Sequence, residues 1–236
     1  MKKTLLAFLL LPLLTFSQEN RVNGVDNFSH SSRDAVRIDY KPGNKGTPYL
    51  YDNWREGYIV ISDSIISHQD ALQLNLINGD LIIGAGRNKE TGVIITDKAV
   101  TGFAINEENN INPHVFAKIK SSKFEESNRS TKFYEIISNI ERTNYLIKEQ
   151  SKYLFDPNKS RGYQTQNSIP QEYKVRKSYY IKNKAGKYVK TRLSKKAILK
   201  KLGDKGSELK AYIHAKKINF SKEHDVVKVL NYYYSL

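Results

Sequence analysis

The stretch LQLNLINGDLII, residues 72–83, decides the fold of this chain. Leucine recurs at every second position from Leu72 to Leu76, with polar residues between, which is the period of a half-buried β-strand. Asn78-Gly79 follows, and residues 81–83 are apolar again. Asn-Gly favours a type I′ turn, because both central residues of that turn need positive φ angles. The stretch therefore predicts an antiparallel β-hairpin.

Strand-like runs of β-branched and aromatic residues recur on both sides of this hairpin. The predicted strands cover residues 58–62, 93–96, 100–105, 115–119, 133–137, 144–148, 177–182 and 187–191. Short, turn-rich connections favour antiparallel neighbours, so we expect a meander in which residues 93–96 pair with 100–105. Asn183-Lys184-Ala185-Gly186 predicts a last hairpin, and residues 156–172 are loop-like in composition.

The pattern changes to a helical period after residue 193. Ser194, Ser207 and Ser221 each precede a short amphipathic run, and each can cap a helix. Helices with one apolar face must pack on something. The sequence therefore predicts an α+β protein, with a mainly antiparallel sheet, curved or a half-barrel, over residues 46–192. A basic helical C-terminal segment, residues 193–236, is expected to pack on that sheet.

The first 17 residues have the pattern of a secretory signal peptide. Lys2-Lys3 precedes an apolar run from Leu5 to Leu14, and cleavage is expected after Ser17. This run is about half the length of a membrane-spanning helix, so we expect no transmembrane segment in the mature chain. No cysteine is present, so the exported chain is not a lipoprotein and has no disulfides. It should reach the periplasm or the extracellular space, and residues 18–45 should form a flexible leader.

The positive charge of the chain is concentrated at one end. Residues 174–236 carry 18 Lys or Arg against four Asp or Glu, a net charge of +14, whereas the whole chain has +15. Such asymmetry indicates contact with an anionic envelope surface or an acidic protein, or else a well-solvated lysine surface. The segment holds only two arginines, which argues against specific nucleic-acid binding. The candidate contact residues are Arg192, Lys195, Lys196, Lys200, Lys201, Lys216 and Lys217.

The aromatic stretch GTPYLYDNWREGYIVI, residues 46–61, contains the only tryptophan of the chain, Trp54. Two interpretations remain open for it. Trp54, Tyr49 and Tyr51 could form an aromatic platform for a ligand, or Trp54 could anchor the packing at one end of the sheet. The position of the stretch, where a polar leader gives way to strand-like alternation, favours the start of the fold.

Motifs with a known chemistry are absent from the sequence. It has neither a GxxxxGK[ST] loop nor a GxSxG elbow, and no two of its five histidines have metal-ligand spacing. We therefore expect no cofactor, no metal and no catalytic residue. Asp52, Glu56 and Asp63 lie near the aromatic stretch and are the acids retained for an alternative, a hydrolase with an acidic site.

Four segments resemble a group of secreted proteins of unknown function from Gram-negative bacteria. They are GTPYLYDNWREGYIVISD from residue 46, FYEII from residue 133, KSYYIK from residue 177, and VVKVLNYYYSL at the C-terminus. Members combine a signal peptide, a [ST]P-[FY]-L-x-[DN]-x-W segment, β-hairpins and a Lys-rich helical tail ending near YYxSL. This chain departs from them at Ser138-Asn139, where a Gly-containing turn is expected. The resemblance implies a compartment and an architecture but no activity.

The functional hypothesis from the sequence is a non-catalytic exported accessory protein. Its basic C-terminal segment would contact an anionic envelope component or a partner protein. An alternative is a carrier of a small ligand, with a pocket in the curved sheet.

Overall fold

The computed structural model describes most of the chain after residue 42. The described residues are 35–37, 43–62, 65–66, 69–85, 91–96, 98–107, 113–126, 128–137, 144–159, 169–203 and 205–236. The predicted signal peptide lies outside them, as do Ser138-Asn139 and most of the predicted leader.

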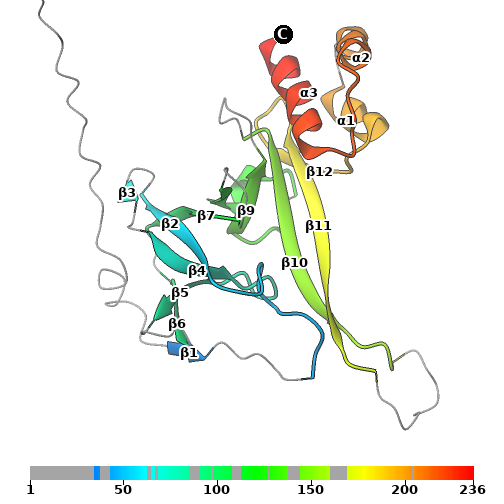
Figure 1. Ribbon diagram of the computed structural model, residues 1–236. Helices are drawn as coiled ribbons and strands as arrows, with labels where there is room; N and C mark the ends of the chain where they lie inside the picture. The colour runs from blue at the N-terminus through cyan, green and yellow to red at the C-terminus, as the bar shows by residue number, and fades with distance from the viewer. Residues whose placement is uncertain are drawn as a thin grey trace, which may run out of the picture.

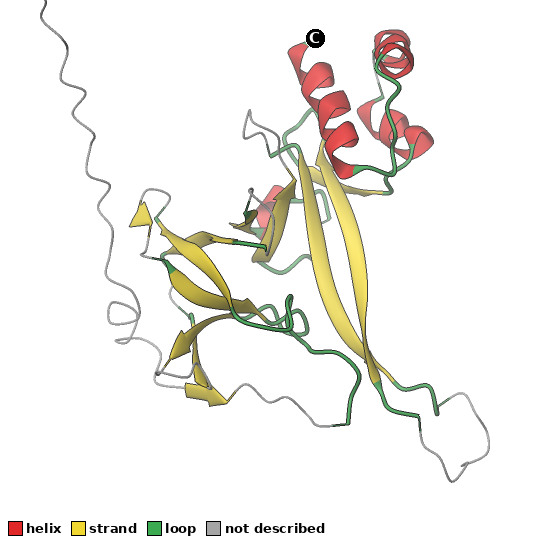
Figure 2. Ribbon diagram, viewed as in Figure 1, coloured by secondary structure: helices red, strands yellow, loops and turns green. Residues whose placement is uncertain are grey.

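Strands precede helices along the described chain (Figures 1 and 2). The strands of the N-terminal half are β1 (Ala35–Arg37), β2 (Arg55–Ile61), β3 (Ile65–Ile66), β4 (Asp70–Leu74), β5 (Leu81–Ala85), β6 (Thr91–Ile94) and β7 (Val100–Ile105). Then come β8 (His114–Ile119), a 3₁₀ turn η2 (Ser121–Lys123), β9 (Lys132–Ile137), β10 (Leu146–Phe155), β11 (Glu172–Lys182) and β12 (Tyr188–Thr191). The helices are α1 (Lys195–Leu202), α2 (Gly206–Ala215) and α3 (Glu223–Ser235).

The described strands form one open antiparallel sheet, as the α+β prediction requires. Its order is β1-β6-β5-β4-β2-β7-β8-β9-β10-β11-β12, and β3 pairs with β2 off this path. The predicted hairpin is present as β4 and β5, with Leu72 opposite Ile83 and Leu74 opposite Leu81. This register brings Leu72, Leu74, Leu81 and Ile83 into one buried cluster.

The type I′ turn predicted for this hairpin is wrong. Gly79 has a φ of 88°, whereas Asn78 is not among the residues with positive φ. The chain instead closes a longer loop, in which the Asn75 N–H donates to the Asp80 carbonyl at 2.9 Å and the Gly79 N–H donates to the Asn75 carbonyl at 2.8 Å. The Asn78 side chain accepts from the Asp80 N–H at 3.1 Å. That local bond offers the loop an alternative to the two-residue turn.

The predicted pairing of residues 93–96 with 100–105 is also wrong. β6 pairs with β5 and β1, while β7 pairs with β2 and β8. Close approach explains the preference of β7 for β2, because a Cβ at Gly57 would stand 2.3 Å from the Ala104 carbonyl oxygen. The free side of β6 is taken by Ala35–Arg37, from within the predicted leader, so part of that leader belongs to the sheet.

β10 and β11 are much longer than the strands predicted at 144–148 and 177–182. They pair over ten positions, from Leu146 opposite Ile181 to Phe155 opposite Glu172, and form a two-stranded arm (Figure 1). The outer part of this arm packs on no core and leaves Tyr153, Leu154 and Val175 exposed, and the sequence analysis did not assign it to strands. Cation–π contacts support it instead, including the Lys174 ammonium 3.8 Å from the Phe155 ring centroid.

The inner part of the arm is buried on both faces. Leu146 and Ile181 belong to a cluster with the apolar faces of the three helices. Their chain neighbours Ile147 and Tyr180 point to the opposite face, where they join Phe124 and two other tyrosines. A third cluster, built around residues such as Phe103 and Phe116, fills the N-terminal half of the sheet.

Only one of the three predicted serine caps is correct. The Ser194 hydroxyl accepts from the Ala197 N–H at 3.3 Å and begins α1. Ser207 lies inside α2, whose N-cap is Lys205 with φ 54°. Ser221 lies one residue before Lys222, the N-cap of α3. Neither lysine makes a side-chain cap, so these two helix starts depend on packing rather than capping.

Candidate functional site

The basic helical end carries the seven cations predicted as an anion-contact surface. α1 and α2 share a core through Ile198, Leu202, Leu209 and Ile213, so their polar faces point outward from one unit. All seven predicted cations are exposed, and within the described residues none has a carboxylate ion-pair partner. They are Arg192, Lys195, Lys196, Lys200, Lys201, Lys216 and Lys217.

The three aromatic side chains of the predicted platform each pack against different residues. Tyr49 is 6% exposed and Tyr51 is half-buried, with its ring edge-on to His114 at 6.4 Å between centroids. Trp54 lies over β6, where its Cη2 would be 3.1 Å from a Cβ added at Gly92. The three rings therefore contribute to packing at separate points.

The acids retained for a hydrolase do not meet in the described structure. Asp52 and Glu56 are both exposed, and Glu56 accepts a hydrogen bond from the Gln69 side chain. Asp63 lies outside the described residues.

A buried charge network that the sequence did not predict lies where β9, β10 and α3 meet. The Lys148 ammonium is 2.9 Å from Glu135 Oε2 and 3.2 Å from Glu223 Oε1. Glu135 and Lys148 are only 4% and 5% exposed. Glu135 also accepts from the Gln150 side chain at 2.7 Å, and the Tyr179 hydroxyl donates to Glu223 at 2.7 Å. The network therefore ties the first turn of α3 to the sheet.

His114 extends this network toward solvent. Its Nδ1 is 2.9 Å from Glu135 Oε1 and its Nε2 is 3.0 Å from Glu107 Oε2. A neutral imidazole can donate from only one nitrogen, so both contacts are satisfied when the ring is protonated. The hydrogen bond to Glu135 raises the pKa of His114; burial opposes this, and Glu107 reinforces it.

The same contacts set the charge of the neighbouring groups. Burial raises the pKa of Glu135, but His114 and Lys148 outweigh it and hold that pKa below its usual value. Burial, together with Glu107 and Glu135, raises the pKa of Tyr51 to about 12. Glu135 therefore stays a carboxylate at neutral pH, in contact with His114 and Lys148. These contacts join β8, β9 and β10, which suits a structural junction.

A pattern in the sequence could have indicated the network. Lys148 stands two residues after Leu146, so both side chains share one face of β10. A lysine on the buried face of a strand requires an acid nearby. The identity of that acid depends on β9 and α3, and residue spacing does not show it.

A second charge cluster occupies the opposite face. Glu149 accepts from Lys132, from the Tyr180 hydroxyl at 2.6 Å and from Arg129 at 3.0 Å. The Arg129 guanidinium also lies 4.5 Å from the Tyr180 ring centroid. Burial raises the pKa of Glu149, but the hydrogen bonds from Lys132 and Tyr180 lower it by a larger amount. The pKa therefore lies below its usual value, and the carboxylate stays charged. This cluster holds the segment after η2 against the sheet.

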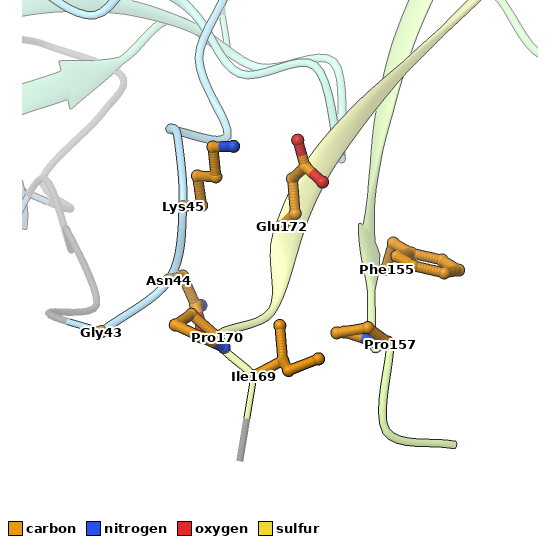
Figure 3. Close-up of a pocket in the computed structure, with 8 residues that line it drawn as sticks. All are labelled: Gly43, Asn44, Lys45, Phe155, Pro157, Ile169, Pro170 and Glu172. Carbon is orange, nitrogen blue, oxygen red and sulfur yellow. The ribbon is translucent and has the colours of Figure 1, made fainter. Parts of the chain in front are cut away.

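A shallow cavity of about 440 Å³ lies at the outer end of the arm (Figure 3). Its apolar walls are Phe155, Pro157, Ile169 and Pro170. Its polar walls are Gly43, Asn44, Lys45 and Glu172. The cavity lies where the chain near Lys45 meets the start of β11, at the end of the arm opposite the basic helices (Figure 1).

The described residues show neither a metal site nor a membrane-spanning helix. Within the part of the chain that the structure describes, no three metal-binding side chains are grouped to hold an ion. No helix there is both long and apolar enough to cross a membrane. Comparison with protein-family models, with characterised proteins and with solved structures finds no match. The resemblance to secreted Gram-negative proteins therefore stays a prediction.

Proposed function

We propose that this chain is a non-catalytic exported accessory protein that contacts an anionic envelope surface through its basic helical end. One observation supports the proposal above the others. The seven cations named above are all exposed, on α1 and on the residues that precede α1 or follow α2, and among the described residues no carboxylate pairs with them. Lysines that served only α-helix solubility would commonly be interspersed with acids.

The chemistry of the surface favours phosphate groups recognised by charge rather than by shape. Lysine acts as a mobile point charge, whereas arginine forms a planar fork that grips phosphate in fixed geometry. Six of the seven cations are lysines. Each lysine near an anionic membrane contributes about 1 kcal/mol, so several together give appreciable affinity that salt removes.

Binding to vesicles tests this proposal. The purified protein is mixed with vesicles of phosphatidylglycerol and phosphatidylethanolamine, and co-sedimentation is measured from about 0.02 to 0.5 M salt. We expect binding that weakens steeply with salt, and none to phosphatidylcholine vesicles. Absence of binding to anionic vesicles at the lowest salt would refute the proposal.

A matched pair of variants assigns the surface. Replacing Lys195 and Lys200 with glutamine should weaken binding about thirtyfold, from about 1 kcal/mol for each charge. Replacing Lys98 and Lys120, also exposed but outside the helices, should change it little. Equal losses in the two pairs would mean that net charge alone, rather than the helical end, determines binding.

The carrier alternative needs a sheet curved as a half-barrel around a pocket. The hydrophobic clusters described above occupy faces of the sheet, and the cavity of about 440 Å³ lies at the outer end of the arm instead. The described residues thus favour surface contact over ligand carriage.

A further inference from the structure

The outer edge of β11 has a gap in its hydrogen-bonding ladder. β12 covers this edge only from Tyr179 to Lys182. At the other end, the Tyr173 N–H donates to the Lys45 carbonyl at 3.0 Å, and the Lys45 N–H donates to the Gln171 carbonyl at 2.7 Å. Residues 174–178 lie between these two pairings and have no strand beside them among the described residues. Figure 1 shows this part of β11 in the two-stranded arm, beyond the reach of β12.

The register identifies which backbone groups face the gap. The Tyr173 N–H points away from β10, toward Lys45. In an antiparallel ladder, alternate residues direct both of their backbone groups to the same side. Val175 and Lys177 therefore direct N–H and C=O groups outward, and no backbone partner for these two amides occurs in the described part of the chain. The gap from Tyr173 to Tyr179 spans about 20 Å at the usual rise of a strand.

The side chains along the gap have a clear chemical character. Lys174 and Arg176 lie on one face of β11, and Val175 and Lys177 lie on the other. No acid occurs from residue 173 to 178. Val175 is 49% exposed, an unusual position for a valine in the middle of a strand. An added strand would thus face two cations on one face, and an apolar residue beside a cation on the other.

We infer that this edge receives an extended segment of an acidic partner protein, added as a further β-strand. Val175 and Lys177 would supply the backbone hydrogen bonds, as in other cases of strand addition. Acidic residues at alternate positions of the segment would lie beside Lys174 and Arg176. Apolar residues between them would cover Val175. This inference uses a different surface from the proposed function and does not depend on it.

Charge decides between this occupant and a second copy of the chain. Pairing two β11 edges would bring Lys174, Arg176 and Lys177 of both copies together, and like charges opposite each other destabilise a sheet. The same cations stabilise an acidic strand.

The test uses a short, labelled peptide that alternates glutamate and valine, about seven residues long to match the gap. A peptide that alternates glutamate and proline is the control, because it has the same charge but lacks the N–H groups that would face Val175 and Lys177 when its glutamates lie beside Lys174 and Arg176. Fluorescence anisotropy should show binding of the first peptide, at least about tenfold tighter than the second. On binding, the amide protons of Val175 and Lys177 should exchange more slowly, as measured by NMR.

Variants of the protein separate the contribution of the backbone hydrogen bonds to peptide binding from the contribution of the charges. Val175→Pro removes an outward N–H and leaves the β10 ladder intact, so it should weaken binding about tenfold while the thermal melt stays close to that of the wild type. Replacing Arg176 and Lys177 with glutamate should do the same without altering the backbone. The matched reversal at Lys98 and Lys120 should change binding less than about twofold.

Four results would overturn the inference. One is no binding of the glutamate-valine peptide up to about 1 mM. Another is equal binding of the two peptides, which would show charge attraction without strand pairing. The third is an unchanged exchange rate at Val175 and Lys177 in the bound state, which remains decisive even if the proline variant fails to fold. A second copy on this edge would appear as a dimer of the free protein, which also contradicts the inference.

Discussion

Replacing Lys148 with methionine should destabilise the fold strongly, although methionine is about as long as lysine and as apolar as the alkyl part of the lysine side chain. The change removes the ammonium that lies 2.9 Å from Glu135 Oε2 and 3.2 Å from Glu223 Oε1. Removing one member of a buried pair costs about 3–5 kcal/mol, because the other charge stays desolvated. Glu135 keeps its contacts to His114 and Gln150, so we expect the lower end, about 3 kcal/mol.

The assay is urea unfolding, followed by Trp54 fluorescence and circular dichroism. A double-mutant cycle gives the control, since Glu135→Gln removes the charge that Lys148→Met leaves unpaired. The double variant should recover about 1–3 kcal/mol relative to the sum of the single changes. The Lys148→Met deficit should also shrink as the pH falls through the pKa of Glu135, because a protonated carboxyl no longer needs the ammonium. A deficit below about 0.5 kcal/mol, or additive single changes, would refute the role assigned to the network.

Two further predictions use the same unfolding assay. Because Glu135 and Glu107 raise the pKa of His114 above its usual 6.5, its stabilisation is complete below pH 6.5 and is lost as pH rises through the raised pKa. His114→Gln should therefore cost more at about pH 5.5 than at about pH 9, and an equal cost at both would contradict the protonated contact. Ser194→Ala should cost about 1 kcal/mol through loss of the α1 cap, whereas Ser207→Ala, inside α2, should cost nothing because alanine favours a helix; the reverse order would contradict the capping assignment.

Strands with one apolar face were predictable from the sequence. The alternation around Leu72 found β4, and the runs at 100–105 and 133–137 match β7 and β9 to within a residue. Regular alternation, as in β4, or a run of β-branched and aromatic residues, as in β9, marks a segment as a strand before its partners are known. The switch to a helical period placed the three helices for the same reason.

The strand order needed information that single segments do not hold. The connection from β6 to β7 is short, which favours pairing of the two strands. The structure instead places β2 beside β7, where Gly57 allows the two backbones to approach. Partner choice in a sheet depends on such close fits and on the whole set of available edges, so adjacency along the chain was a poor guide here.

The outer arm and the charge network were missed for a common reason. Both depend on polar side chains whose partners come from distant segments, as with Lys148 of β10 and Glu223 of α3. The period of the apolar residues shows which side chains are buried, but it does not show which charged side chains form pairs. The basic helical end, by contrast, was visible at once, because exposure of lysine is the default and needs no partner.

The two proposed contacts of this protein differ in how salt should affect them, and that difference can separate them. Attraction of the helical lysines to phosphate is a surface effect, screened within about 8 Å at physiological ionic strength. Strand addition at Val175 and Lys177 has two components, a backbone ladder and the charges of Arg176 and its neighbours. Salt should remove the second component and leave the first. Vesicle binding should therefore vanish as salt rises, whereas peptide binding should fall to a plateau that the Val175→Pro variant lacks.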